Sequence, residues 1–176
     1  MTGEEAKATS YTIGASAAER FHLDIDGIRR GHYTDQYFNN VQHVLETLAK
    51  EGHRFAGSLP SSIAQNVGSS RLDVIVGDMD ADVQIFARRQ PFSIVAGVEC
   101  ALAVIAACTG HFDETSGRFV ATVDRLEVRV VREGTRLAPW LPMIRIAGRY
   151  REFAILETVV LGILTRMSLV ATNTYE

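Results

Sequence analysis

Residues 94–109 are the most constraining segment of this chain, because they are apolar on nearly every side. Pro91 precedes the segment and Gly110 follows it, which is the usual order at the two ends of a helix. The segment therefore predicts a buried helix covered by a sheet and by other helices. Its one charged residue is Glu99, and we expect this carboxylate at the helix rim or paired with an arginine, since burying it unpaired is costly.

Two other segments have the periodicity of helices. Apolar side chains recur at three- and four-residue intervals in residues 35–51, with Thr34 placed as N-cap and Gly52 as the stop. Residues 150–167 carry their apolar side chains on one broad face. Both patterns predict helices that pack one face on the core, and the second has more apolar surface than one sheet covers.

The remaining segments predict short strands and turns. Alternating or compact apolar patterns indicate strands at residues 21–28, 72–76, 81–87, 126–130 and 143–147. Residues 55–70 are rich in Gly, Ser, Pro and Ala, which predicts a loop. The alternation of apolar residues changes phase near Asp124, which predicts a bulge. Strands and helices do not alternate regularly, so the expected fold class is α+β, a mostly antiparallel sheet with packed helices.

Composition excludes several classes of protein. Of the 176 residues, 47% are hydrophobic and 22% charged, which is typical of a folded domain rather than a disordered chain. The net charge of −3 predicts no general affinity for nucleic acid or anionic membranes. Residues 1–18 are small and polar and predict a flexible tail without a signal peptide, and residues 94–108 are too short to span a bilayer. Cys100 and Cys108 show no zinc spacing, which favours a cytoplasmic location.

Known ligand-binding motifs are absent. The acidic run at residues 78–82 begins like a calcium loop, but Val83 and Arg89 stand where that loop needs Gly and Glu, so we interpret it as a solvated turn. The five histidines are scattered without metal-ligand spacing. No P-loop, dinucleotide fingerprint or nucleophile elbow occurs. We therefore predict no metal site and no bound cofactor within this chain.

A few residues remain open to two interpretations. Arg88 and Arg89 close a predicted strand and are suited to a phosphate, although a solvated strand end is the simpler interpretation. Tyr37 lies in the first turn of its predicted helix, where it either covers the edge of the core or meets a ligand. Asn173 follows the last predicted helix and by itself indicates only a helix end.

Taken together, four segments resemble the N-terminal part of nicotinate phosphoribosyltransferases. They are YTDQYF at 33–38, VQIFARR at 83–89, IRIAGRYREFAILETVVLGIL at 144–164 and SLVATN at 168–173. Their order and spacing fit as well, and the resemblance covers residues 21–176. It implies that residues 19–176 form the sandwich-like α/β N-terminal domain of this family, without the C-terminal barrel that follows in its members.

The resemblance also implies a function, in which nicotinate and 5-phosphoribosyl 1-pyrophosphate give nicotinate mononucleotide for NAD biosynthesis. Members are homodimers in which the N-terminal domain of one subunit completes the site of the other. Tyr37 would be the aromatic platform under the pyridine ring, with Arg88, Thr158 and Asn173 as further substrate-binding residues. Thr158 stands where related quinolinate enzymes place Arg, which favours a monocarboxylate.

Catalytic residues and magnesium ligands would lie in the barrel, so the resemblance implies no catalytic residue here and an inactive lone chain. Two other interpretations stay open. One is a non-catalytic ligand-binding or assembly module that keeps the family fold. The other is a lipoyl-carrier-like domain in the strand-rich residues 118–148, which is disfavoured because the chain's only lysines are Lys7 and Lys50.

Overall fold

The computed structural model describes residues 16–175. The helices are α1 (Ser16–Arg20), α2 (Ile25–Arg29), α3 (Gln36–Lys50), α4 (Ser61–Val67), α5 (Val98–Cys108) and α6 (Glu157–Tyr175). The strands are β1 (Arg54–Ser58), β2 (Arg71–Ile75), β3 (Asp80–Phe86), β4 (Ser93–Ile94), β5 (Gly110–Phe112), β6 (Phe119–Ala121), β7 (Glu127–Val130), β8 (Arg136–Leu137) and β9 (Pro142–Arg149). Single 3₁₀ turns lie at Val76–Asp78, Val123–Arg125, Tyr150–Glu152 and Ala154–Leu156. Of the predicted tail, residues 16–18 belong to α1 and residues 1–15 lie outside the described residues.

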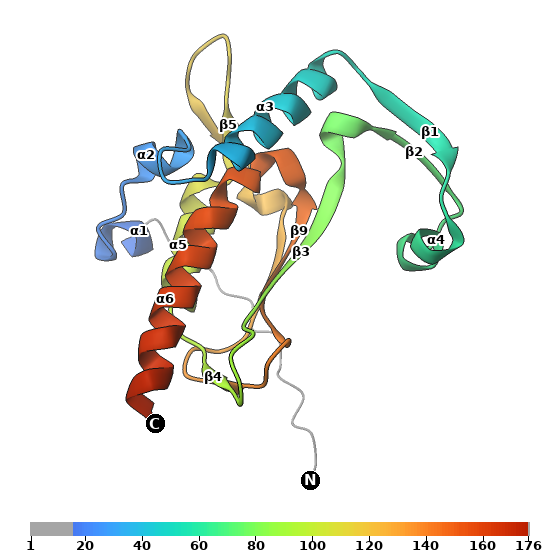
Figure 1. Ribbon diagram of the computed structural model, residues 1–176. Helices are drawn as coiled ribbons and strands as arrows, with labels where there is room; N and C mark the ends of the chain where they lie inside the picture. Colours follow the sequence, from blue (N-terminus) through green and yellow to red (C-terminus); the bar gives the residue numbers. More distant parts are fainter. Residues whose placement is uncertain (1–15, 176) are drawn as a thin grey trace.

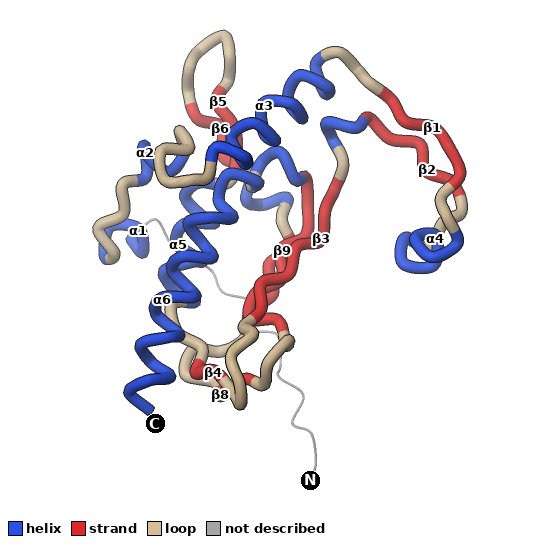
Figure 2. Tube along the Cα trace, in the orientation of Figure 1, coloured by secondary structure: helices blue, strands red, loops and turns tan. Residues whose placement is uncertain are grey.

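The central sheet is antiparallel, with the strand order β3-β9-β7. Val83 of β3 and Val128 of β7 both pair with Ile146 of β9 in the middle. Helices α5 and α6 lie side by side against one side of the sheet (Figures 1 and 2). The core between the layers includes the fully buried Ile105, Ile144 and Leu164. The predicted α+β class, with a mostly antiparallel sheet and packed helices, is confirmed.

Helix α5 is the buried helix that the apolar segment predicts, although it begins at Val98 rather than at residue 94. Residues 93–94 instead form β4, which pairs with β8. Gly97 then turns the chain with a φ of +91°, and a Cβ there would lie 2.9 Å from Met167 Sδ. Glu99 is at the exposed rim and pairs with Arg20 at 2.5 Å, so the expectation for this carboxylate is confirmed.

The N-terminus of α5 is capped by a side chain from a distant turn. Glu133 accepts hydrogen bonds from the Gly97 and Val98 N–H groups at 2.6 and 2.8 Å. A carboxylate at this position satisfies two unpaired donors and meets the positive end of the helix dipole. Glu133 therefore joins the turn before β8 to the start of the core helix.

Replacing Glu133 by Gln is expected to lower the free energy of unfolding by about 0.5–2 kcal/mol, because the amide offers one acceptor oxygen and no charge. Urea unfolding at neutral pH measures the loss. Glu127→Gln is the matched control, since Glu127 forms an exposed ion pair with Arg129. Equal stability of the two variants would contradict the capping role.

Two predicted segments are wrong. Residues 21–28 are not a strand: Asp24 accepts a hydrogen bond from Gly27 N at 3.0 Å and starts helix α2, which buries Ile28. Residues 55–70 are not a loop, because they contain most of β1 and all of α4. Strand β1 pairs with β2 through residues 54–58, and this arm extends away from the central sheet (Figures 1 and 2).

The boundaries of α3 and α6 also differ from the predictions. Asp35, not Thr34, caps α3 by accepting a hydrogen bond from Tyr37 N at 2.8 Å. Helix α6 begins at Glu157 after two 3₁₀ turns, rather than at residue 150. It continues past residue 167 because the buried hydroxyls of Ser168 and Thr172 hydrogen-bond to the chain around β4, at Ala96 and Ile94.

The segment Ala154–Tyr175 is long and apolar enough to cross a membrane by length and composition, with a mean hydropathy of 1.8. The core helix of a folded domain meets the same criterion, and Val160 and Leu164 of this segment are buried against the sheet and α5.

Candidate functional site

The N-termini of α3 and α6 meet at Thr158. Its hydroxyl lies 3.2 Å from the backbone N–H of Asp35 and 3.2 Å from the hydroxyl of Thr34. Thr158 therefore fixes the first turn of α3 against the first turn of α6, although the two helices are far apart in the sequence.

Tyr37 is presented at this junction. Its side chain is 64% exposed, while its backbone N–H is held by Asp35. The ring packs edge-on against Phe38, with the ring centroids 5.1 Å apart. One face of a positioned phenol is thus open to solvent, which suits the stacking of a flat aromatic ligand.

Tyr150 and Glu157 form a partly buried pair next to this surface. The Tyr150 hydroxyl donates to Glu157 Oε2 at 3.5 Å. Burial raises the pKa of Tyr150 to about 12, and the negative charge of Glu157 adds to the rise. Burial also raises the pKa of the Glu157 carboxyl, against the opposing effect of the hydrogen bond from Tyr150. Tyr150 is therefore a neutral donor at physiological pH.

The raised pKa of Glu157 predicts a pH-dependent contribution to stability. A raised folded-state pKa favours the protonated carboxyl, so this stability is fully present below the unfolded-state pKa and is lost as pH rises through the folded-state pKa. Glu157→Gln should therefore gain in melting temperature relative to the wild type between about pH 4 and about pH 8. A constant difference in melting temperature across that range would contradict this assignment.

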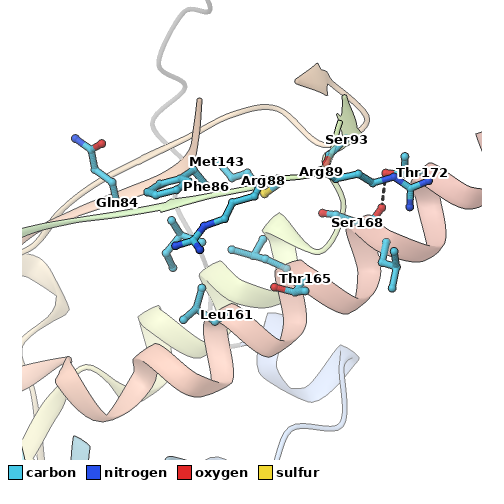
Figure 3. Close-up of a pocket in the computed structure, with 14 residues that line it drawn as sticks. Gln84, Phe86, Arg88, Arg89, Ser93, Met143, Leu161, Thr165, Ser168 and Thr172 are labelled. Atoms are coloured by element: carbon cyan, nitrogen blue, oxygen red, sulfur yellow. Dashed lines mark hydrogen bonds between the residues drawn. The ribbon is translucent and has the colours of Figure 1, made fainter. Parts of the chain in front are cut away.

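A groove of about 500 Å³ runs between β3 and α6 (Figure 3). Apolar side chains such as Ile85, Leu161 and Leu164 line much of it. Arg88 reaches into the groove, with its guanidinium carbon 5.4 Å from the ring centre of Trp140. The aromatic ring holds the cation at the side of the groove.

The structure separates the four predicted site residues into different places. Tyr37 and Thr158 come together where α3 and α6 begin. Asn173 lies near the other end of α6, about 22 Å further along the helix axis, and accepts a hydrogen bond from Arg89 at 2.6 Å. Arg88 lines the groove beside α6. The next element after Arg89 is the short strand β4, so no helix N-terminus lies beside the two arginines in the sequence.

Tyr150 and Glu157 were not predicted as site residues. Both lie inside the segment at 144–164 that carries the family resemblance, but their proximity depends on the two 3₁₀ turns before α6, which sequence periodicity does not reveal. Within residues 16–175, no group of three or more His, Cys, Asp or Glu side chains is placed to hold a metal ion.

The fold and the sequence identify the class of this domain. Residues 66–168 match the family model described as the N-terminal domain of quinolinate phosphoribosyl transferase. The match covers more than half of the chain, and the chain belongs to this family. No curated protein sequence matches the chain significantly.

Two solved structures are similar. The nicotinate-nucleotide pyrophosphorylase of Pyrococcus furiosus is 24% identical with a TM-score of 0.51, over 85% of this chain and 28% of that one. Human nicotinic acid phosphoribosyltransferase is 20% identical with a TM-score of 0.49, over 80% of this chain and 27% of that one. The first likeness supports the fold, and this chain spans little more than a quarter of either protein.

Proposed function

We propose that this chain is the N-terminal part of a nicotinate phosphoribosyltransferase, and that Tyr37 forms the aromatic platform of the pyridine site. The observation that carries this proposal is the 64% exposure of a tyrosine whose backbone N–H is held by the Asp35 side chain, while the backbone N–H of Asp35 is held by Thr158. An electron-poor pyridine ring stacks favourably on a phenol. Membership of the phosphoribosyltransferase family supports the reaction class.

Thr158 supports nicotinate rather than quinolinate as the substrate. Its hydroxyl is engaged with Thr34 and Asp35, and it brings no positive charge to the surface beside Tyr37. Quinolinate carries a second carboxylate, for which an arginine is the best-suited partner. A neutral side chain at this position therefore fits a ring with one carboxylate.

The proposal assigns the phosphoribosyl donor, the catalytic residues and magnesium to a barrel domain, and the described residues hold no cluster suited to that ion. In the proposed homodimer, the surface around Tyr37 completes the site of another subunit's barrel. This chain then binds and orients the pyridine ring and takes no part in bond making.

The test compares the purified chain with the chain supplied with a phosphoribosyltransferase barrel, in trans or fused after Glu176. Nicotinate mononucleotide should form only when the barrel is present. Thr158→Arg should shift the preference of this assembly from nicotinate toward quinolinate. Transfer by the lone chain would overturn the proposal. A chain that binds nicotinate but supports no transfer with any barrel would be the non-catalytic module instead.

A further inference from the structure

The groove between β3 and α6 is long and has an apolar base. Its volume of about 500 Å³ is in the range of small-molecule sites. Helix α6 lines it from Leu161 to Thr172, which corresponds to about 16 Å along the helix axis. Ile85, Met143 and Leu164 are buried at its base. A groove of this length and polarity suits an extended apolar chain better than a single ring.

The charge in this groove is of one sign. The described residues that line it include two arginines and no aspartate or glutamate, although the whole chain has a net charge of −3. Arg89 donates a hydrogen bond to Asn173 at 2.6 Å. Arg88 points into the groove (Figure 3), and within residues 16–175 it forms no hydrogen bond or ion pair. Its guanidinium carbon lies 5.9 Å and 5.4 Å from the ring centres of Phe86 and Trp140. The rings therefore hold a cation whose N–H donors are unused.

We propose that this groove binds a carboxylate that carries an unbranched apolar chain, such as decanoate. The planar guanidinium of Arg88 can donate two parallel N–H···O hydrogen bonds to the two carboxylate oxygens. The chain then lies along α6 and covers Leu161 and Leu164, where the release of water from apolar surface favours binding. With carbon–carbon bonds of about 1.5 Å, an extended chain of about ten to twelve carbons matches the length of the groove.

The hydroxyl groups of the groove do not need a ligand. Ser168 and Thr172 are buried, and their hydroxyls hydrogen-bond to the chain around β4. The polar contact of the ligand therefore depends on Arg88, while the other walls supply apolar surface. Neither Tyr37 nor Thr158 lines the groove, so this site is separate from the proposed pyridine site and does not depend on the proposed function.

Tryptophan fluorescence tests the polar contact. Trp140 is the only tryptophan of the chain and lies beside Arg88, so titration of the full chain with decanoate should change its emission with saturation at one site. Arg88→Gln should raise the Kd about fivefold or more, because a neutral amide binds a carboxylate less tightly than a guanidinium does. Arg71→Gln is the matched control, since it removes an exposed arginine from β2 in the arm, and it should leave the Kd unchanged.

A series of ligands and a groove-filling variant test the apolar contact. Each CH₂ removed from decanoate should weaken binding about fourfold. Decanol has the chain without the charge, so it should bind the wild type and Arg88→Gln equally. Thr165→Phe places a ring in the groove and should abolish the binding of both ligands, with circular dichroism as the check that the variant is folded.

Four results would overturn the proposal. They are the absence of saturable decanoate binding, equal decanoate affinity of the wild type and Arg88→Gln, an affinity that does not depend on chain length, and full binding by Thr165→Phe. Nicotinate should not displace decanoate, because the two sites are separate. Displacement by nicotinate would place the acid in the pyridine site and would also contradict the proposal.

Discussion

Replacing Leu102 by Ala is expected to lower the free energy of unfolding by about 2–5 kcal/mol, one of the largest single losses that a core position of this size gives. Leu102 is 5% exposed on α5, and the residues around it are themselves close to fully buried, including Val98, Ala101 and Ile105. A cavity formed there has little freedom to collapse, because the helix is enclosed by α6, α2 and the sheet. Chemical denaturation with a constant m-value measures the loss.

Ile63→Ala provides the matched control for this prediction. Ile63 is 48% exposed on α4, in the arm that extends from the central sheet. Its truncation removes a similar number of methyl groups from a position with little burial, and should change stability by less than about 0.5 kcal/mol. Equal losses for the two variants would show that α5 is not the centre of the core.

The second large effect is expected at Tyr37. In the assembly with a barrel, Tyr37→Ala should lower kcat/KM for nicotinate by about 5- to 150-fold, which corresponds to a stacking contribution of about 1–3 kcal/mol. Tyr37→Phe keeps the ring and should retain most of the activity. Steady-state kinetics with nicotinate varied at saturating phosphoribosyl donor measures both variants.

A subunit-mixing experiment separates the two sides of this site. If Tyr37 serves a barrel in another subunit, mixing Tyr37→Ala with a barrel-site variant should restore part of the activity, because one kind of site then has both partners intact. Tyr37→Phe with the activity of Tyr37→Ala would contradict a stacking role. Mixed subunits with no recovery would place Tyr37 beside the barrel of its own subunit.

Helix α3, helix α5 and strands β2, β3, β7 and β9 could be predicted from the sequence, because each has a clear periodic pattern. The expectation that Glu99 lies at the helix rim or pairs with an arginine also followed from the cost of burying a carboxylate, and both hold. The irregularity near Asp124 is the 3₁₀ turn Val123–Arg125, which resets the phase between β6 and β7. In these segments local pattern and tertiary packing favour the same structure.

The segments that could not be predicted depend on tertiary contacts. The Gly- and Ser-rich residues 55–70 form a strand because β2 pairs with them, and their composition shows no apolar alternation. The end of α6 depends on hydroxyls that bond to the chain around β4, so Asn173 falls inside the helix. Glu133 caps α5 from a turn remote in sequence, which no local motif reveals.

For the candidate site, the family resemblance brought out both Tyr37 and Thr158, and the structure places them at one junction. Arg88 and Asn173 came from the same resemblance, but the structure places them elsewhere. Arg88 lines the groove beside α6, and Asn173 lies near the C-terminal end of α6. The sequence alone does not reveal the distance between Thr158 and Asn173. That distance depends on the length of α6, which has Thr158 in its first turn and Asn173 in its last.

The most direct test of the central claim is the dissociation constant for nicotinate, measured by calorimetry for the barrel alone and for the barrel with this chain. The account predicts tighter binding when the chain is present, and loss of most of that gain with Tyr37→Ala but not with Tyr37→Phe. Identical dissociation constants with and without the chain would contradict the claim that this domain forms part of the nicotinate site.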